Sequence, residues 1–478
     1  MRQSYSESFE VACLEHGDQI ATIDPTGAAV SFSNLFYTVL AFAEALQDHG
    51  VRKGDLVAVH VLDAIAGTAL KLALLRIGAS AMGTTGADGS LGVAPAFHLI
   101  EGGAPTTGGT DIVVGRDWIR SPRRWVPIAG GGRMITSTSG TTGLPKLCQI
   151  SDTDLIKRVQ RSARWRGLPE GAVFIGYSPF SNPFFNHMSR AVLSGMTHIH
   201  PRADEFASLA LMDRVGVQTA YLSPWNFRRI LDAAEAGAVR PHRLRRIVTG
   251  GGELAPALAT RAETIFNAEV ILSYGSSETG SIAHTRPALH PDLPGCLGRP
   301  YADLGLRFQA EDGGILDPVT GGELWIKTPE TIQVQEFPSG KPVTNADGWV
   351  GTGDLCRMLA DGTLLFMGRR SELLNIGGNK VAPQLFEALA RTVPGVADVA
   401  AFRLPEPGGG DQLGLAVVPG PGLDPAVLTT RLAAELGARY AFTVLIRSAL
   451  PVTSAGKMDR RRLAAEHAED IQRAVAQD

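Results

Sequence analysis

Short apolar runs alternate with stretches of helical periodicity in the first eighty residues. A short strand over 30–35 is followed by apolar residues at helical spacing from Leu35 to His49. A buried strand is predicted over Leu56–Val61, and a helix over Ala64–Ile77 that ends at Gly78. This strand–helix rhythm indicates a mostly parallel sheet covered by helices.

The alternation continues towards the C-terminus. The pattern predicts strands over 111–115, 173–177, 197–199, 217–222 and 246–249, and helices over 188–193 and 226–236. The passage 80–109 is rich in Gly, Thr and Pro, and the pattern places no element in it. From Pro383 a helix precedes strands over 396–402 and 413–418, which predicts a small α+β unit of about a hundred residues.

Composition limits the classes of partner. The chain has 478 residues, which favours roughly two to four domains, and its net charge of −3 argues against nucleic acid or membrane as the main partner. Its four cysteines form no CxxC pair, and the apolar run 57–79 is interrupted by charges. A cytoplasmic protein is therefore expected. His198 and His200 lack a nearby third ligand and are expected to be surface residues at a strand end.

The stretch from Met134 to Gln149 is the strongest candidate for chemistry. Between Thr136 and Thr142 every residue except Gly140 carries a hydroxyl, and Lys146 adds a cation. Hydroxyls, backbone N–H groups freed by glycine and one cation suit a loop that holds a polyphosphate. By composition alone, a polar surface loop is an equally good interpretation.

The motif itself resembles the phosphate-loop signature of the acyl-adenylate-forming superfamily, which includes acyl- and aryl-CoA ligases, adenylation domains of peptide synthetases, and luciferases. The matching residues are Thr138-Ser139-Gly140-Thr141-Thr142-Gly143-Leu144-Pro145-Lys146. Further matches follow in the family's order: Tyr274-Gly275-Ser276-Ser277-Glu278, Gly348 to Leu355, Gly368-Arg369, and Pro451 to Arg460.

The resemblance implies roles for these residues in binding ATP. The loop would hold the β- and γ-phosphates with Thr138, Ser139, Gly140, Thr141, Thr142, Gly143 and Lys146. Glu278 would bind Mg²⁺, and Ser277 would lie against the α-phosphate. Asp354, beside Arg369, would accept hydrogen bonds from the ribose. Lys457 would bridge the carboxylate and the α-phosphate.

The remaining nucleotide contacts and the acid pocket also follow from the resemblance. Gly251 and Tyr274 would line the nucleotide. The acid would lie against Phe180, Asn182, Phe184, Phe185, Gly250 and Gly275. The neutral Asn182 argues against an α-amino acid, and an apolar slot favours an aromatic acid over a small aliphatic one. The phenylalanines are equally well explained as ordinary core.

The family's architecture is expected to hold for this chain. The fold would be α/β, with a large N-terminal adenylate-forming domain of several subdomains over 1–368 and mostly parallel sheets. A hinge over 369–371 would precede a small, mobile α+β cap over 372–478. The hinge carries Ser371, where relatives carry Asp or Lys. Cap rotation would bring 375–381 towards the thiol.

The resemblance implies that the enzyme activates a small carboxylic acid, expected to be aromatic, as acyl-AMP with release of pyrophosphate. Transfer to a thiol would follow. CoA is the expected acceptor because Gly348-Trp349 is closer to CoA ligases and no carrier domain follows the cap. The alternatives are a free-standing enzyme that loads a carrier-protein pantetheine, a diazotase that adenylates nitrite for an aryl amine, and a non-catalytic nucleotide-binding member. The intact Lys146, Glu278, Asp354, Arg369 and Lys457 speak against the last.

Overall fold

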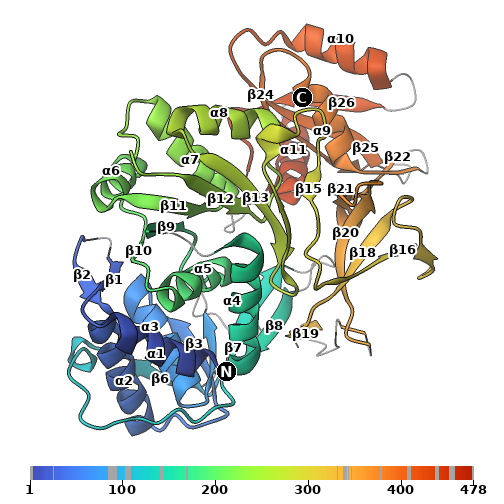
Figure 1. The fold of residues 1–478 in the computed structure, drawn as a ribbon. Helices are drawn as coiled ribbons and strands as arrows, with labels where there is room; N and C mark the ends of the chain where they lie inside the picture. Colours follow the sequence, from blue (N-terminus) through green and yellow to red (C-terminus); the bar gives the residue numbers. More distant parts are fainter. Residues whose placement is uncertain are drawn as a thin grey trace. The chain divides into compact units, whose positions relative to one another are not determined.

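The fold divides into two compact units in the computed structural model (Figure 1). The described residues are 4–24, 26–83, 94–102, 109–139, 145–167, 171–330, 332–336, 342, 344–345, 347–376, 379–405, 411–436, 441–451 and 458–475. The first unit comprises Met1–Pro291, Leu297–Leu306 and Trp325–Gly351, and the second comprises Asp292–Cys296, Arg307–Leu324 and Thr352–Asp478.

An eight-stranded sheet in the first unit has the order β14-β13-β12-β11-β9-β10-β1-β2. Its strands are β1 (Ile20–Ile23), β2 (Ala29–Ser31), β9 (Ala172–Gly176), β10 (His198–Ile199), β11 (Val217–Leu222), β12 (Arg246–Gly250), β13 (Glu269–Ser276) and β14 (Gly280–Thr285). The six inner strands are parallel, whereas β2 and β14 pair antiparallel at the edges. The parallel strands end at one edge of the sheet, where ligands bind in open α/β folds.

A seven-stranded sheet in the same unit has the order β19-β8-β7-β4-β3-β5-β6. Its strands are β3 (Leu56–His60), β4 (Ser80–Gly83), β5 (Phe97–Ile100), β6 (Thr110–Val113), β7 (Arg133–Ser139), β8 (Pro145–Ser151) and β19 (Ile332–Glu336). The passage 80–109 therefore contains two short strands, β4 and β5, that the sequence pattern did not place.

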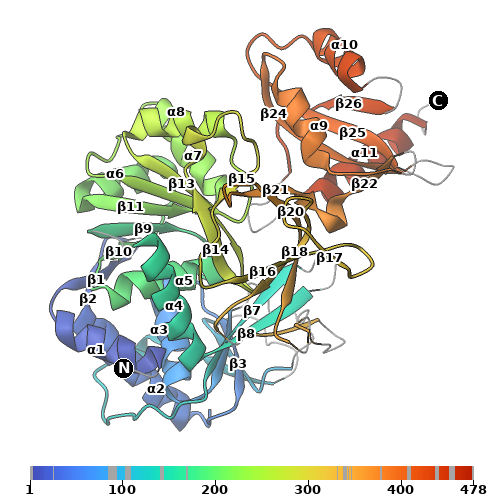
Figure 2. The ribbon, with the colours of Figure 1, turned by 45° about the vertical axis from the view of Figure 1, so that its right-hand side comes forward.

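Helices pack on these sheets (Figure 2). They are α1 (Tyr5–His16), α2 (Phe32–Asp48), α3 (Ala64–Arg76), α4 (Asp152–Arg166), α5 (Asn182–Leu193), α6 (Glu205–Val215), α7 (Pro224–Glu235) and α8 (Pro256–Phe266), with 3₁₀ turns η1 (Arg116–Trp118) and η2 (Pro287–Leu289). One apolar core joins α1–α5 to the sheets, and a second lies under α6–α8. On β9, Val173 and Ile175 enter the first core and Phe174 enters the second, so both faces of this strand are buried.

The second unit contains a small α+β region, as predicted. A six-stranded sheet, which belongs mainly to this unit, has the order β15 (Cys296–Gly298), β21 (Leu364–Arg369), β20 (Val350–Met358), β18 (Gly322–Lys327), β16 (Gly305–Gln309) and β17 (Ile315–Leu316). It is followed by η3 (Arg370–Glu372), the hairpin β22 (Leu374–Ile376) and β23 (Asn379–Val381), α9 (Pro383–Arg391), β24 (Val396–Pro405), β25 (Asp411–Pro419), α10 (Pro425–Leu436), β26 (Phe442–Ile446) and α11 (Arg460–Val475). Strands β24, β25 and β26 form one sheet. The hinge over 369–371 and the boundaries 1–368 and 372–478 stay predictions.

His198 and His200 are buried, so the expectation of surface histidines was wrong. Each is 3% exposed, because β10 lies between β9 and β1 inside the sheet. Their rings meet with His198 Nδ1 3.2 Å from His200 Nε2. Burial lowers the pKa of His200 to about 4, so the pair is neutral at physiological pH. Among the described residues no three His, Cys, Asp or Glu side chains form a metal-binding group.

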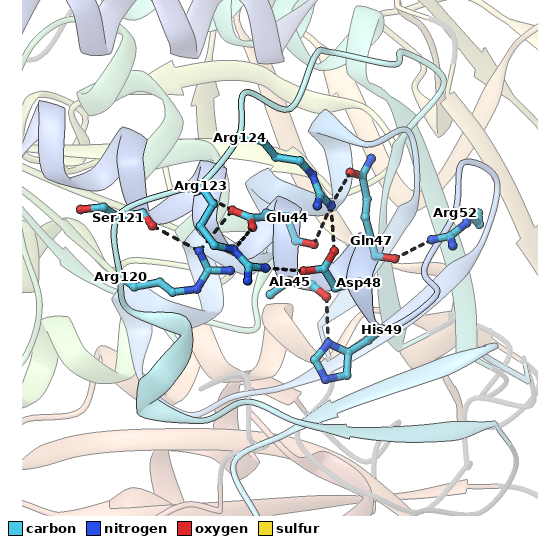
Figure 3. A network of polar contacts seen from close by, with 10 residues as sticks. All are labelled: Glu44, Ala45, Gln47, Asp48, His49, Arg52, Arg120, Ser121, Arg123 and Arg124. Atoms are coloured by element: carbon cyan, nitrogen blue, oxygen red, sulfur yellow. Dashed lines mark hydrogen bonds and ion pairs between the residues drawn. The ribbon is translucent and has the colours of Figure 1, made fainter.

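Two acidic residues of α2 hold the irregular segment 119–132 (Figure 3). The fully buried Glu44 accepts hydrogen bonds from the Arg123 backbone and from the Arg120 and Arg123 side chains, at 2.8, 3.2 and 2.5 Å. Asp48 pairs with Arg123 and Arg124 at 2.8 and 2.9 Å. A segment without a helix or strand of its own is thus fixed by charge-assisted bonds to a helix.

This network predicts an acid-sensitive contribution to stability. Burial alone would raise the pKa of Glu44, but the hydrogen bonds from Arg120 and Arg123 lower it from 4.5 to about 2. Because the pKa is lower in the folded state, the stabilisation is present above the unfolded pKa and is lost as the pH falls towards 2. We expect the melting temperature of the native protein to fall more steeply between about pH 5 and pH 3 than that of Glu44→Gln. Thermal unfolding across this pH range measures the melting temperature, with the exposed Glu466→Gln as control. If the melting temperature changed equally with pH in all three proteins, the prediction would be contradicted.

None of the described helices has both the length and the apolar character that a membrane span requires.

Candidate active site

The candidate phosphate loop joins two strands that pair antiparallel. Strands β7 and β8 pair antiparallel up to Thr138 opposite Lys146 and Ser139 opposite Pro145. The loop candidates Gly140, Thr141, Thr142 and Gly143 lie outside the described residues. Lys146 is 7% exposed, and its backbone lies between Thr138 on β7 and Glu336 on β19. The hairpin thus fixes the base of the loop on a sheet.

A run of glycines that begins at Gly250 lies at the carboxyl edge of the eight-stranded sheet. Gly250 ends β12 opposite Ser273 of the parallel strand β13. A Cβ atom on Gly250 would lie 2.5 Å from the Ser273 carbonyl oxygen, so only glycine fits there. Gly251, the next residue, is exposed. Gly250 therefore allows β12 to approach its neighbour β13 closely.

A narrow turn joins β13 to β14 and carries the second motif. The Ser276 hydroxyl accepts a hydrogen bond from the Thr279 backbone N–H at 3.2 Å. A Cβ atom on Gly275 would lie 2.2 Å from the Gly280 carbonyl oxygen, so the two strands approach closely at this point. Tyr274, Gly275, Ser277 and Glu278 are half-buried. The turn therefore presents Ser277 and Glu278 side by side at the end of a parallel strand.

Two arginines of α4 hold this turn by its backbone. Arg158 donates to the carbonyl oxygens of Ser277 and Glu278, at 3.0 and 3.3 Å. Arg161 donates to those of Thr279 and Ser281, at 2.8 and 2.7 Å. Because α4 follows β8 directly, it links the phosphate-loop hairpin to the Ser277–Glu278 turn. Burial lowers the pKa of Arg158 to about 10, so it stays charged at neutral pH.

Arg161 is balanced by a buried carboxylate. Its Nε lies 2.6 Å from Glu330 Oε1, with side-chain exposures of 5% and 0%. No local sequence pattern marks these arginines, because they lie on α4 about 120 residues before the turn that they bind. Arg158 and Arg161 are three residues apart on one helix, a spacing that surface arginines share.

The predicted acid-pocket residues fall into two groups. Phe180 follows β9 and Asn182 begins α5, and both are half-buried near the carboxyl edge of the sheet. Helix α5 begins at Asn182, earlier than predicted, because Ser181 caps it and Pro183 occupies its first turn. Phe184 and Phe185 lie in the core at 1% and 2% exposure, where they contact the rings of His200 and Tyr5. Ordinary core is the simpler interpretation of these two.

The ribose candidates are neighbours in the second unit. Asp354 on β20 lies opposite Arg369 on β21, and Arg369 Nε is 2.8 Å from Asp354 Oδ1. Asp354 is 5% exposed, so the arginine orients a nearly buried carboxylate. Ser371 is exposed in η3. Lys457 lies outside the described residues.

Comparison with known proteins decides the family. The sequence model of a family described as AMP-binding enzyme matches residues 133–334. The chain is also 30% identical, over 386 residues, to a salicylyl-CoA synthase / salicylate adenylyltransferase from a Streptomyces species, covering 76% of this chain and 69% of that protein. The chain belongs to the AMP-binding enzyme family. The predicted resemblance to acyl-adenylate-forming enzymes is thereby confirmed, and so is the prediction of an ATP-dependent ligase.

Further similar proteins are consistent with this family and with its fold. A fatty acid–[acyl-carrier-protein] ligase from Mycobacterium marinum is 29% identical over 357 residues, covering 69% of this chain and 67% of that protein. ATP-bound MatB from Rhodopseudomonas palustris has a TM-score of 0.82 at 20% identity, covering 96% of this chain and 99% of the other. The amide bond synthetase McbA from Marinactinospora thermotolerans has a TM-score of 0.78 at 22% identity, with the same coverage. These two structures confirm the predicted α/β fold.

Proposed function

We propose that this AMP-binding enzyme activates a small aromatic carboxylic acid as acyl-AMP and then transfers the acyl group to CoA. The observation that carries the proposal is the 30% identity to a salicylyl-CoA synthase over 76% of the chain. A relative named 2-hydroxy-7-methoxy-5-methyl-1-naphthoate–CoA ligase, from Streptomyces carzinostaticus, is 28% identical over 350 residues and supports an aromatic substrate. It covers 70% of this chain, which spans 62% of that relative.

The first step replaces a poor leaving group. A carboxylate oxygen attacks the α-phosphorus of ATP, a new P–O bond forms, and the bond to pyrophosphate breaks. The protein's contribution is to position the reactants and to neutralise charge. In this proposal the phosphate loop and Lys146 hold the departing β- and γ-phosphates, and Lys457 lies between the acid and the α-phosphate.

Glu278 is the proposed ligand of Mg²⁺. Its carboxylate belongs to a turn whose backbone is held by Arg158 and Arg161, so the backbone that carries this side chain is fixed in position. One carboxylate together with phosphate oxygens is the usual environment of nucleotide-bound Mg²⁺. The ion would neutralise charge on the phosphates. Ser277, next to it, is proposed to donate to the α-phosphate.

The second step needs the acyl-AMP to meet a thiol. Attack of the CoA sulfur on the acyl carbon forms a thioester and releases AMP. Asp354, oriented by Arg369, is proposed to hold the ribose, with Gly251 and Tyr274 beside the nucleotide. Ser371 is proposed as the pivot that lets the segment 375–381 reach the thiol.

A carrier protein is the second candidate acceptor. The 29% identity to a fatty acid–[acyl-carrier-protein] ligase over 69% of the chain favours it. A carrier's pantetheine arm ends in the same thiol as CoA, so the chemistry of transfer is the same for both. The two acceptors are separated by supplying each to the preformed acyl-AMP.

A pyrophosphate-release screen tests the proposal. Purified protein with ATP and Mg²⁺ is given benzoate, hydroxybenzoates, short aliphatic acids or nitrite, with and without CoA. We expect pyrophosphate release with aromatic acids, and an acyl-CoA product by mass spectrometry only when CoA is present. Release with nitrite alone would favour the diazotase alternative. ATP binding without release for any acid would favour a non-catalytic member.

Asn182 offers a test of the acid pocket. Asn182→Asp should lower kcat/KM for unsubstituted benzoate by about tenfold or more. The introduced carboxylate would have to lose its hydration when the apolar ring binds beside it. The control is Asn34→Asp, the same substitution at an exposed asparagine on α2. An unaltered rate in Asn182→Asp would remove Asn182 from the pocket.

A further inference from the structure

Lys71 is a buried lysine on α3 that the proposed reaction does not use. It is 4% exposed, and its helical neighbours Leu70 and Leu72 are buried apolar residues. Its Nζ donates a hydrogen bond to the Pro179 carbonyl oxygen at 2.8 Å and lies 5.8 Å from the centre of the Phe180 ring. Burial lowers the pKa of Lys71 to about 8, so the amine is mostly charged at neutral pH.

The ammonium lies where the carboxyl ends of two sheets come together. Gly83 ends β4 of one sheet, and Phe180 follows β9 of the other. A Cβ atom on Gly83 would lie 3.3 Å from both Lys71 Nζ and the Phe180 carbonyl oxygen, so the three groups are neighbours. Ligands bind outside the carboxyl ends of parallel strands, and the proposed acid pocket begins at Phe180.

The contacts of Lys71 leave most of its donor capacity unused in the part of the chain that the structure describes. An ammonium has three N–H donors, and one donates to Pro179. Among the described residues, no carboxylate forms an ion pair with Lys71. A buried charge without a counter-charge destabilises a fold by several kcal/mol. A lysine kept in such a position is best explained by a partner that arrives with the ligand.

We propose that Lys71 recognises a second oxygen group on the acid, so that the substrates are acids with a hydroxyl or a further carboxylate besides the reacting one. This inference rests on the proposed function and narrows its substrate class. The ammonium is a compact point charge that can donate to a phenolic oxygen or a carboxylate. A bare benzoate would leave it without this partner.

The test compares acids within one enzyme and between variants. Pyrophosphate release is measured with benzoate, with 2-, 3- and 4-hydroxybenzoate and with phthalate. We expect the native enzyme to prefer at least one oxygen-bearing acid over benzoate by about tenfold or more. In Lys71→Met, which keeps the length and removes the charge, that preference should fall by about 10- to 100-fold. Thermal unfolding checks that the variant is folded.

Each other outcome overturns the inference in a recognisable way. An equal loss for every acid means that Lys71 only anchors the 178–181 segment through Pro179. A native enzyme without preference overturns the inference whether or not the variant folds. Failure to release pyrophosphate with any acid would instead refute the proposed function.

Discussion

Replacing Lys457 with alanine should lower acid-dependent pyrophosphate release by about 10²- to 10³-fold while ATP binding persists. The proposed reaction brings an anionic carboxylate to an anionic α-phosphate, and both carry their charge into the transition state. A positioned cation stabilises that state far more than it stabilises bound ATP. The loss should therefore appear mainly in kcat.

Two measurements check this prediction. Steady-state pyrophosphate release gives the rate, and isothermal titration with ATP gives the affinity. Lys157→Ala is the control, because Lys157 is an exposed lysine of α4 in an ion pair with Asp154. Unchanged turnover in Lys457→Ala would refute the proposed role, and loss of ATP binding would make Lys457 a nucleotide-binding residue instead.

The second large effect is expected from Glu330. Glu330→Leu leaves the buried Arg161 guanidinium without its carboxylate, and breaking such a pair costs about 3–5 kcal/mol. Arg161 also holds the turn that carries Ser277 and Glu278, so turnover should fall as well. Urea unfolding measures the stability, and pyrophosphate release measures the turnover.

A double variant separates these two effects. Arg161→Met with Glu330→Leu removes both charges, so part of the lost stability should return. Turnover should stay low, because the Thr279 and Ser281 carbonyl oxygens still lack their donor. The control is Glu466→Gln in the exposed pair with Arg462, which should cost about 1 kcal/mol or less. A Glu330→Leu protein as stable as this control would contradict the role of the pair.

The sequence pattern predicted those helices and strands that have a regular apolar period of their own. The helix α2 has a regular apolar face, and the predicted strand over 217–222 matches β11. Strands β4 and β5 were missed because each has four residues, too few for a clear period beside glycines. The start of α5 was missed because Ser181-Asn182-Pro183 is as typical of a turn as of a helix cap.

The parts of the site that were missed depend on contacts between distant residues. Nothing near Arg158 or Arg161 in the sequence marks a turn about 120 residues away as their partner. His198 lies on β10 and His200 directly follows that strand, and their burial follows from the position of β10 inside the sheet. Lys71 interrupts the apolar pattern of α3. In the sequence this charge argues against a membrane span, but the pattern does not indicate whether it also binds a ligand.

Oxygen labelling tests the acyl-adenylate step most directly. The acid is prepared with ¹⁸O in both carboxylate oxygens and is turned over with ATP, Mg²⁺ and CoA, and the AMP is analysed by mass spectrometry. Attack of the carboxylate on the α-phosphorus predicts one ¹⁸O atom in each AMP released. AMP without label, or label in inorganic phosphate together with ADP, would contradict the account.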